Sequence, residues 1–318
     1  MVNIWDPHFH IWDVSEVTQS GHDPAQLFAP KEDPVYTIDR YENDMAMEGF
    51  KLTGGVFVEA VSVCHVESDG PLFEESCLAE TVWTSKEMDR SKLDYRIVAS
   101  APLESSNIES ILASLKQHQR VCGIRQIINH EPSWPRNEKR GDFLENPSWR
   151  KGFALLEEFG MSFDLQLNPH QFIDASILGE AHPNIPMIIG HLGSPTLADL
   201  EQGQRYWEGM QRLAELEQAT IKLSMLTYQD PEWDSNQLVK ETVLKIIDLF
   251  GIDRCFFASN FPVEQHLGWS ASRLYQSFHD LVKHFSEDEQ NKLFSQNAKL
   301  AYPPVSYTHL TLPTTSFV

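Results

Sequence analysis

The sequence predicts an α/β fold with a single (β/α)8 TIM-type barrel. Two observations favour it. Short β-rich runs alternate with longer amphipathic stretches almost from end to end, and there are eight such runs, the strand number of this barrel. The length of 318 residues suits one barrel of about 250 residues with loop insertions.

The predicted strands are segments rich in β-branched and aromatic residues. In chain order they are Ile4–His10, Gly55–Val61, Tyr95–Pro102, Val121–Ile128, Met161–Asn168, Pro186–Leu192, Ile221–Met225 and Arg254–Pro262. Amphipathic segments between them predict helices, among them Glu104–Arg120, Trp149–Phe159, Leu197–Gln218 and Ser235–Phe250. A doubly wound open sheet is the alternative, because strand number alone does not prove closure. No Gly-rich phosphate loop of the dinucleotide or Walker type follows any predicted strand.

One domain is expected over residues 1–304, because no linker and no internal repeat divides them. Its last helix is predicted by the capping box of Ser286 and Glu289 and should run to about Tyr302. Residues 305–318 differ in kind. The segment VSYTHLTLPT continues no helical or strand pattern and resembles a translated sequencing adapter, so we exclude this tail, with His309, from the functional argument.

Composition favours a protein that acts on small molecules. Hydrophobic residues make up 41% and charged residues 22%, which is ordinary for a globular protein. The net charge of −21 argues against nucleic acid and anionic membrane surfaces as partners. Cys122 and Cys255 lie in apolar segments and are interpreted as buried thiols. With no secretory signal and no apolar run of about 20 residues, we expect a cytoplasmic location. The oligomeric state is not predicted.

The motif Asp6-Pro-His8-Phe-His10 ends the first predicted strand. Residues i and i+2 of a strand point to the same side, so both imidazoles should face the barrel lumen. They should lie at the C-terminal mouth, where barrel active sites are found. Two imidazoles about 7 Å apart along a strand can converge on one divalent ion such as Zn²⁺. The alternative is that core hydrogen bonds or solvent satisfy both histidines.

Two further strands supply polar groups at the mouth. His191 follows four apolar or small residues and precedes a Gly-Ser-Pro turn. On the fifth predicted strand, alternation puts Asp164, Gln166 and His170 on one face, which we expect to be the lumen. Pro169 leaves the direction of His170 open.

The eighth predicted strand ends in Ser259-Asn260-Phe-Pro-Val-Glu264. A metallohydrolase usually has a carboxylate here, which ligates the metal and takes the proton from the attacking water. Asn260 can ligate weakly or hydrogen-bond a substrate, but an amide cannot act as a base. Hydrolysis would then need another base, and the candidates are Glu59, His170, Glu264 and His266.

Other polar residues are candidates for substrate contact. Glu59 closes the second strand and is a base, a ligand or a solvated strand-end charge. Arg125 on the fourth strand can donate paired hydrogen bonds to a substrate carboxylate or lactone oxygen, or it can form a structural ion pair. The amides of Gln166 and Asn260 can orient a substrate ring. Lys222, on the seventh strand, is interpreted as structural.

The HxH motif of the first strand, the histidine of the sixth and the Ser-Asn-Phe-Pro-Val segment of the eighth together resemble the amidohydrolase-related group of the amidohydrolase superfamily. Within this group the sequence is most similar to the sugar-lactonase branch that includes L-fuconolactonase. The resemblance covers residues 1–302 and includes Gly123-Ile-Arg125, Phe163-Asp-Leu and Asn297-Ala.

The resemblance implies a distorted barrel that binds one divalent metal, for which zinc is the favoured candidate, or that has no obligatory metal, as in some lactonases. It matches His8, His10 and His191 to the family's catalytic and metal-binding histidines. Asn260 stands where most members have a catalytic Asp, and His170 is an offset substitute for a strand-five histidine. Three neutral histidine ligands would lower the pKa of a zinc-bound water to about 7, which reduces the need for a carboxylate base. No fourth-strand lysine is present to be carbamylated, which argues against a binuclear centre.

The function expected from these features is hydrolysis of a small lactone or ester, in particular a sugar or sugar-acid lactone. A lyase of the same superfamily, which decarboxylates an aromatic or 2-oxo acid at a similar metal, is one alternative. A catalytically inactive barrel that binds a small polyol or acid is another, and Asn260 is the residue that favours it.

Overall fold

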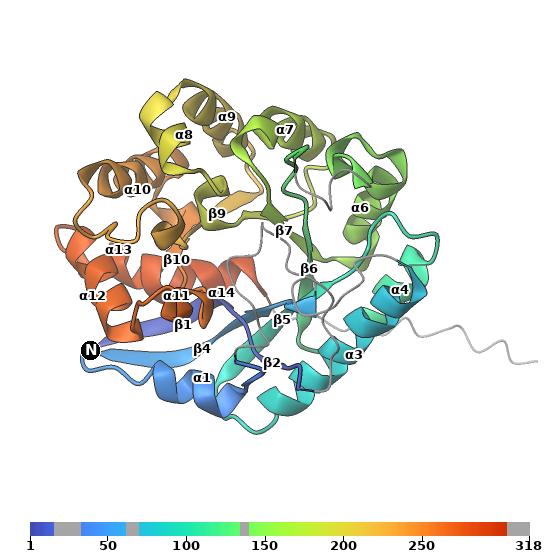
Figure 1. Ribbon diagram of the computed structural model, residues 1–318, viewed down its shortest axis with the longest axis horizontal. Coiled ribbons are helices and arrows are strands. Elements are labelled where there is room, and N and C mark those ends of the chain that lie inside the picture. The colour runs from blue at the N-terminus through green and yellow to red at the C-terminus, as the bar shows by residue number, and fades with distance from the viewer. Residues whose placement is uncertain (16–32, 62–69, 134–139, 304–318) are drawn as a thin grey trace, which may run out of the picture.

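The computed structural model describes residues 1–15, 33–61, 70–133 and 140–303. Eight of its strands form one parallel sheet in the order β1-β4-β5-β6-β7-β8-β9-β10. Figure 1 shows these strands at the centre of the molecule, with helices around them. The tail of residues 305–318 lies outside the described residues.

The first and last strands of the sheet meet, which closes the barrel. Phe9 forms a parallel bridge with Phe261. The backbone N–H of His10 donates to the Phe261 carbonyl at 2.8 Å, and that of Asn260 donates to the His8 carbonyl at 2.8 Å. The barrel prediction is therefore confirmed and the open sheet is excluded.

All eight predicted strands are present. Their bounds are β1 Val2–Phe9, β4 Phe50–Val58, β5 Asp94–Ser100, β6 Val121–Ile127, β7 Ser162–Gln166, β8 Met187–Ile189, β9 Ala219–Leu223 and β10 Cys255–Phe257. Strands β8 and β10 end earlier than predicted. The chain leaves the extended conformation at His191 (φ 55°) and at Asn260 (φ 54°), both in the left-handed region that side chains rarely adopt. Each strand therefore ends in a sharp turn at a candidate site residue.

Helices surround the barrel. They are α1 Ile38–Asp44, α3 Pro71–Met88, α4 Ile108–Leu115, α6 Pro147–Phe159, α7 Phe172–Ala181, α8 Leu197–Gln202, α9 Gln204–Ala214, α10 Gln237–Phe250, α11 Val263–His266, α12 Ala271–Leu281, α13 Glu287–Asn291 and α14 Asn297–Ala301. The predicted helix over 197–218 is broken at Gly203, whose φ of 68° suits a residue without a Cβ. The capping box of Ser286 and Glu289 is confirmed at the start of α13.

The connection after β1 carries a second, two-stranded antiparallel sheet, in which β2 (Trp12–Asp13) pairs with β3 (Val35–Tyr36). Among the described residues, no helix combines the length and the apolar composition that a membrane crossing requires.

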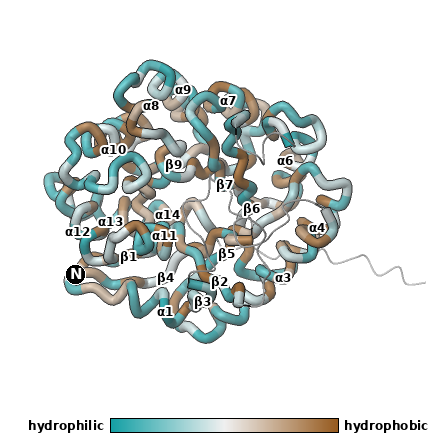
Figure 2. The backbone as a smooth tube through the Cα atoms, viewed as in Figure 1, coloured by the Kyte–Doolittle hydropathy of each residue, from teal (hydrophilic) through white to brown (hydrophobic). Residues whose placement is uncertain are grey.

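The barrel core has an inner and an outer layer. Side chains between the sheet and the helices form the large outer cluster, whereas a smaller cluster fills the barrel interior, with the inward-facing residues Trp5, Val56, Val58, Val98, Cys122, Ile188 and Phe256. Tyr302, after α14, joins the inner cluster. Cys122 and Cys255 are buried, as the sequence predicts. Figure 2 shows hydrophobic residues along central strands such as β7, and hydrophilic residues mostly on outer helices and loops.

Candidate active site

His8 and His10 come together inside the mouth of the barrel. Their Nε2 atoms lie 3.2 Å apart, and both side chains are buried. Phe9 between them faces the other side of β1 and stacks on Tyr41, with ring centroids 4.0 Å apart. The two imidazoles therefore share a face of the strand, in agreement with the alternation of the HxH motif.

His191 completes a cluster of three imidazoles. It starts the short 3-10 helix η4 (His191–Gly193) just past β8, and its ring centroid lies 4.5 Å from that of His8. Its Nδ1 lies 2.9 Å from the Ser224 hydroxyl, which comes just after β9. The left-handed turn after β8 therefore brings His191 to the pair on β1.

Burial keeps the three imidazoles neutral at ordinary pH. It lowers the pKa of His8 and of His191 well below the usual value, with the nearby Lys222 cation as the next cause. Burial, followed by the charge of Arg125, lowers the pKa of His10 to about 3. Neutral imidazole is the form that ligates metals and that accepts a proton.

Arg125 of β6 lies beside the histidines. Its Nε donates to the Glu59 carboxylate at 2.8 Å and its Nη2 to the Glu59 carbonyl at 2.5 Å. Its Nη1 donates to Gln166 Oε1 at 3.0 Å and lies 3.5 Å from His8 Nε2. Glu59 and Arg125 are both buried, so the pair is shielded from solvent and fixes the direction of the guanidinium.

A second buried ion pair lies on the other side of His8. Lys222 Nζ donates to Asp164 Oδ2 at 2.5 Å and lies 3.2 Å from His8 Nδ1. The hydroxyl of Tyr302 donates to the Asp164 carboxylate at 2.9 Å. The sequence interpretation of Lys222 as structural misses its contact with His8, because that contact joins two strands that are not neighbours in the sheet.

Asn260 lies between His10 and Glu264. Hydrogen bonding with the Asn260 side chain raises the pKa of His10 and lowers the pKa of Glu264. Asn260 therefore lies next to both side chains, although within the described residues its buried Nδ2 and the Oε1 of Glu264 have no hydrogen-bond partner.

The other two base candidates have different neighbours. His170 lies in the 3-10 helix η3 (Pro169–Gln171), is exposed, and its ring centroid is 6.2 Å from that of His130. His266 Nε2 lies 3.5 Å from the Asp33 carboxylate. The structure thus brings together seven of the eight predicted site residues and leaves His170 at the rim: the group is His8, His10, Glu59, Arg125, Gln166, His191 and Asn260.

The histidine pair matches part of a divalent metal site. Bond lengths of about 2.0–2.1 Å place two nitrogen ligands of a tetrahedral zinc about 3.3 Å apart, close to the 3.2 Å between the Nε2 atoms of His8 and His10. His10 Nδ1 donates to the Val58 carbonyl at 2.7 Å, which leaves the Nε2 lone pair available. Within the described ranges, however, no three or more His, Cys, Asp or Glu side chains are arranged to hold a metal ion. The pair fits, and the third ligand, His191, stays a prediction.

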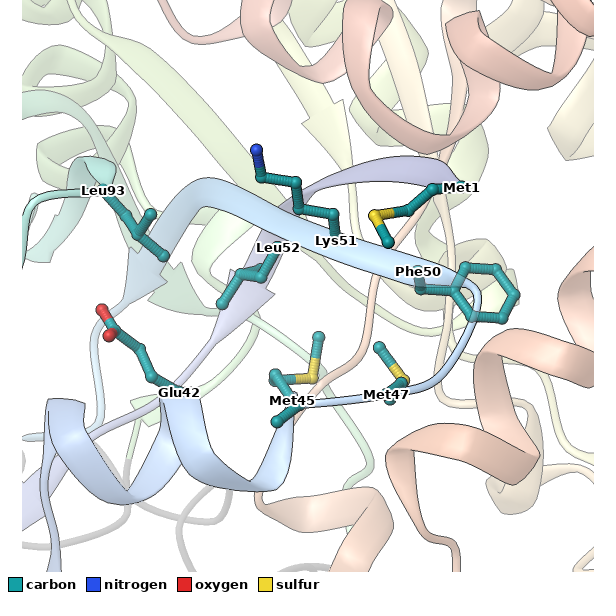
Figure 3. A pocket seen from close by; sticks show the side chains of 9 residues that line it. Met1, Glu42, Met45, Met47, Phe50, Lys51, Leu52 and Leu93 are labelled. Atoms are coloured by element: carbon teal, nitrogen blue, oxygen red, sulfur yellow. The ribbon is translucent and has the colours of Figure 1, made fainter.

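A separate cavity of about 470 Å³ opens at the opposite end of the barrel. Figure 3 shows it beside the starts of β1 and β4, lined by side chains that are mostly apolar. Met1, Met45 and Phe50 are among them. In this fold the N-terminal face of the strands serves stability rather than catalysis, so the cavity does not belong to the reaction centre.

Comparisons with known proteins agree with this geometry. The chain is 28% identical over 306 residues to an uncharacterized protein, y4mH, of Sinorhizobium fredii, and the match covers 95% of this chain and 98% of that protein. A Burkholderia multivorans amidohydrolase crystallised with bound zinc superposes with a TM-score of 0.74 at 18% identity, covering 94% of this chain and 98% of that one. A probable 2-pyrone-4,6-dicarboxylic acid hydrolase of Acinetobacter baumannii, crystallised with citric acid, superposes with a TM-score of 0.69 at 17% identity, covering 94% and 99%.

At these identities the two solved structures support the shared barrel fold. The sequence family described as "Amidohydrolase" matches residues 5–303, which span the whole barrel from β1 to the end of α14. The resemblance predicted from the sequence is therefore confirmed for the superfamily, whereas the sugar-lactonase branch stays a prediction. With the HxH motif on β1 and the third histidine after β8 in the places that the barrel gives to a reaction centre, the chain belongs to the amidohydrolase family.

Proposed function

We propose that this protein is a hydrolase that opens a small lactone or ester by attack of water at the three-histidine cluster. The observation that carries the proposal is the buried guanidinium of Arg125 beside neutral imidazoles at the barrel mouth. Neutral imidazoles can hold a metal or accept the proton of a water, and a fixed guanidinium can bind a carbonyl or carboxylate oxygen.

We assign His8, His10 and His191 as catalytic residues and as the ligands of one divalent metal, for which zinc is the favoured candidate. When bound there, zinc supplies a water of lowered pKa and polarises a carbonyl oxygen. The zinc in the Burkholderia amidohydrolase supports this assignment. The prediction that the enzyme has no obligatory metal stays open beside it, because a neutral imidazole can itself accept a proton from water.

We assign substrate orientation to Arg125, Gln166 and Asn260. Gln166 accepts from Arg125, so the two side chains present a joined polar surface beside His8. Glu59 holds the guanidinium by its carboxylate and its carbonyl, so both of these groups already accept hydrogen bonds from Arg125. For Glu59 we therefore propose a positioning role rather than proton transfer. His170 stays a candidate for substrate contact at the rim.

For the substrate class we propose a sugar or sugar-acid lactone. An acid group on the substrate suits the Arg125 guanidinium, and the name of the Acinetobacter relative, a hydrolase of a lactone with two carboxyl groups, is consistent with such a substrate. A small-molecule substrate also agrees with the net charge of −21, which disfavours nucleic acid. We expect the reaction to take place in the cytoplasm.

The test is a panel of aldonolactones and acid lactones assayed with a pH indicator, because ring opening releases a proton. We expect acidification with at least one of them, and loss of that signal in His8→Ala and His10→Ala. Glu241→Gln, an exposed substitution on α10, is the control and should leave the rate unchanged. Release of carbon dioxide from hydroxybenzoates would favour the lyase, and inactivity throughout would favour the inactive binder.

A further inference from the structure

Lys222 and Asp164 form a buried ion pair that the proposed roles do not use. Lys222 lies on β9 and Asp164 on β7, and both side chains are buried. Lys222 Nζ donates to Asp164 Oδ2 at 2.5 Å, and the Tyr302 hydroxyl donates to the same oxygen at 2.9 Å. A buried ion pair is weak evidence for stability, because the desolvation of two charges can exceed their attraction. The pair therefore calls for a role besides stability.

The ion pair presents a hydrogen-bond donor to His8. Lys222 Nζ lies 3.2 Å from His8 Nδ1. An ammonium group has three N–H donors and no acceptor. If its proton moved to Asp164, the lone pair of the amine would accept a hydrogen bond from the protonated carboxyl, and only N–H groups would be left for His8. In both cases Nδ1 of the neutral His8 ring is the acceptor, so the ring proton lies on Nε2.

The contacts at the other side of the His8 ring agree with this tautomer. His8 Nε2 lies 3.2 Å from Nε2 of His10. His10 Nδ1 lies 2.7 Å from the Val58 carbonyl, so it carries the proton of its ring and leaves Nε2 as an acceptor. Arg125 Nη1 is farther from His8 Nε2, at 3.5 Å, and already donates to Gln166 at 3.0 Å. His8 Nε2 therefore donates to His10 Nε2.

This tautomer bears on the metal proposed for the histidines. A metal-bound imidazole almost always donates its other ring N–H to a carboxylate, a carbonyl or water. His10 has such a partner in a backbone carbonyl, and the Ser224 hydroxyl beside His191 can donate or accept. At His8 the neighbour of the other ring nitrogen is instead an N–H donor of Lys222. Ligation through His8 Nε2 would need the ring proton on Nδ1, where it would face this donor.

We propose that Lys222, held by Asp164, is a positioning residue that keeps the proton of His8 on Nε2 and so joins His8 to His10 in the metal-free protein. This proton must leave Nε2 before His8 can ligate a metal. The inference rests on the proposed function only for that metal. Its consequence is that the cluster binds zinc more weakly than three unopposed imidazoles would, so Lys222 sets the balance between the metal-free and the metal-bound site.

The first test observes the tautomer by NMR, without substrate or metal. In protein labelled with ¹⁵N-histidine, the His8 ring should have a protonated Nε2 and an unprotonated Nδ1, with the spectrum of His8→Gln giving the assignment. The double variant Asp164→Asn/Lys222→Met removes the donor without leaving an unpaired charge. In it the Nδ1 signal should move toward that of a ring nitrogen that accepts no hydrogen bond. Lys151→Met, an exposed substitution on α6, is the control and should match the wild type.

The second test measures zinc affinity at fixed pH by competition with a chromophoric chelator. The double variant should bind zinc about 10- to 100-fold more tightly than the wild type, the range by which partners of a metal-ligating histidine change metal affinity. Asp164→Asn alone keeps the donor at His8 and should bind zinc no more tightly than the wild type. Lys151→Met should again match the wild type.

Two results would overturn the inference. One is a His8 ring protonated on Nδ1 in the metal-free wild type, and the other is a double variant that binds zinc no more tightly than the wild type. Inactivity of the wild type on every lactone, with the expected tautomer and difference in zinc affinity, would support the inference and overturn only the hydrolase proposal.

Discussion

The buried carboxylate of Glu264 allows a prediction about the stability of the variant Glu264→Gln that needs no substrate. Burial raises the pKa of Glu264 from 4.5 to about 7. The folded protein therefore holds this proton more tightly than the unfolded chain. Below the unfolded pKa both states are protonated and the group has no effect. As pH rises from about 4.5 to about 7, only the unfolded state loses the proton, so the free energy of unfolding falls.

The size of the effect follows from the pKa difference. About 2.5 pH units at about 1.36 kcal/mol each give about 3 kcal/mol of wild-type stability that is present at low pH and absent above pH 7. The glutamine side chain of the variant has no proton equilibrium, so the variant lacks this loss. Its stability relative to the wild type should therefore rise by about 3 kcal/mol between about pH 4.5 and about pH 8.

The assay is urea unfolding followed by tryptophan fluorescence at several pH values. Subtracting the wild-type free energy of unfolding at each pH removes the contribution of the other titrating groups. The control Glu241→Gln should differ from the wild type by the same amount at every pH. A difference between Glu264→Gln and the wild type that stays constant within about 0.5 kcal/mol over this range would refute the reasoning. It would mean that Glu264 ionises as it does in water.

Three further variants or treatments test the rest of the site. Arg125→Lys keeps the positive charge but loses the paired N–H donors of the guanidinium. We expect the KM for an acid lactone, measured by steady-state kinetics, to rise about tenfold with kcat less affected. An unchanged KM would show that Arg125 does not bind the substrate. Lys222→Met leaves the Asp164 carboxylate buried without its cation and should lower the free energy of unfolding in urea by about 3–5 kcal/mol. The double variant Asp164→Asn/Lys222→Met should recover most of this stability. No recovery would show that the loss comes from packing rather than from the unpaired charge. Treatment with a chelator should remove a divalent metal, detected by elemental analysis, and lower the rate until zinc is restored, whereas an unchanged rate would support the metal-independent reaction.

The sequence predicts the barrel well because each strand carries its own pattern. Alternation alone places His8 and His10 on one face, and the polar face of β7 contains Asp164 and Gln166, which the structure finds inside the barrel in contact with Lys222 and Arg125. These are local consequences of the period of a strand.

What the sequence does not reveal depends on closure and on backbone turns. The contact of Lys222 with His8 joins β9 to β1, and it exists only because the sheet closes. The left-handed conformations of His191 and Asn260 cut β8 and β10 short, and neither residue is a glycine that would signal them. Glu264 appears in the sequence as one of four base candidates, and only the structure shows that it is fully buried and accepts a hydrogen bond from Thr227.

The charges inside the barrel bear on the metal. Arg125 is paired with Glu59 and Lys222 with Asp164, so the charges within each buried pair balance, and an ionised Glu264 adds a buried negative charge that no such pair includes. A divalent cation at the imidazoles would favour this ionised form and lower the pKa of Glu264 below about 7. In the wild type we therefore expect zinc to lower the pH at which the free energy of unfolding decreases. In Glu264→Gln we expect zinc to cause no such shift. Urea unfolding with zinc and with a chelator measures it. Equal midpoints in the wild type under both conditions would mean that the metal, if bound, lies too far from Glu264 to change the pKa of its carboxylate.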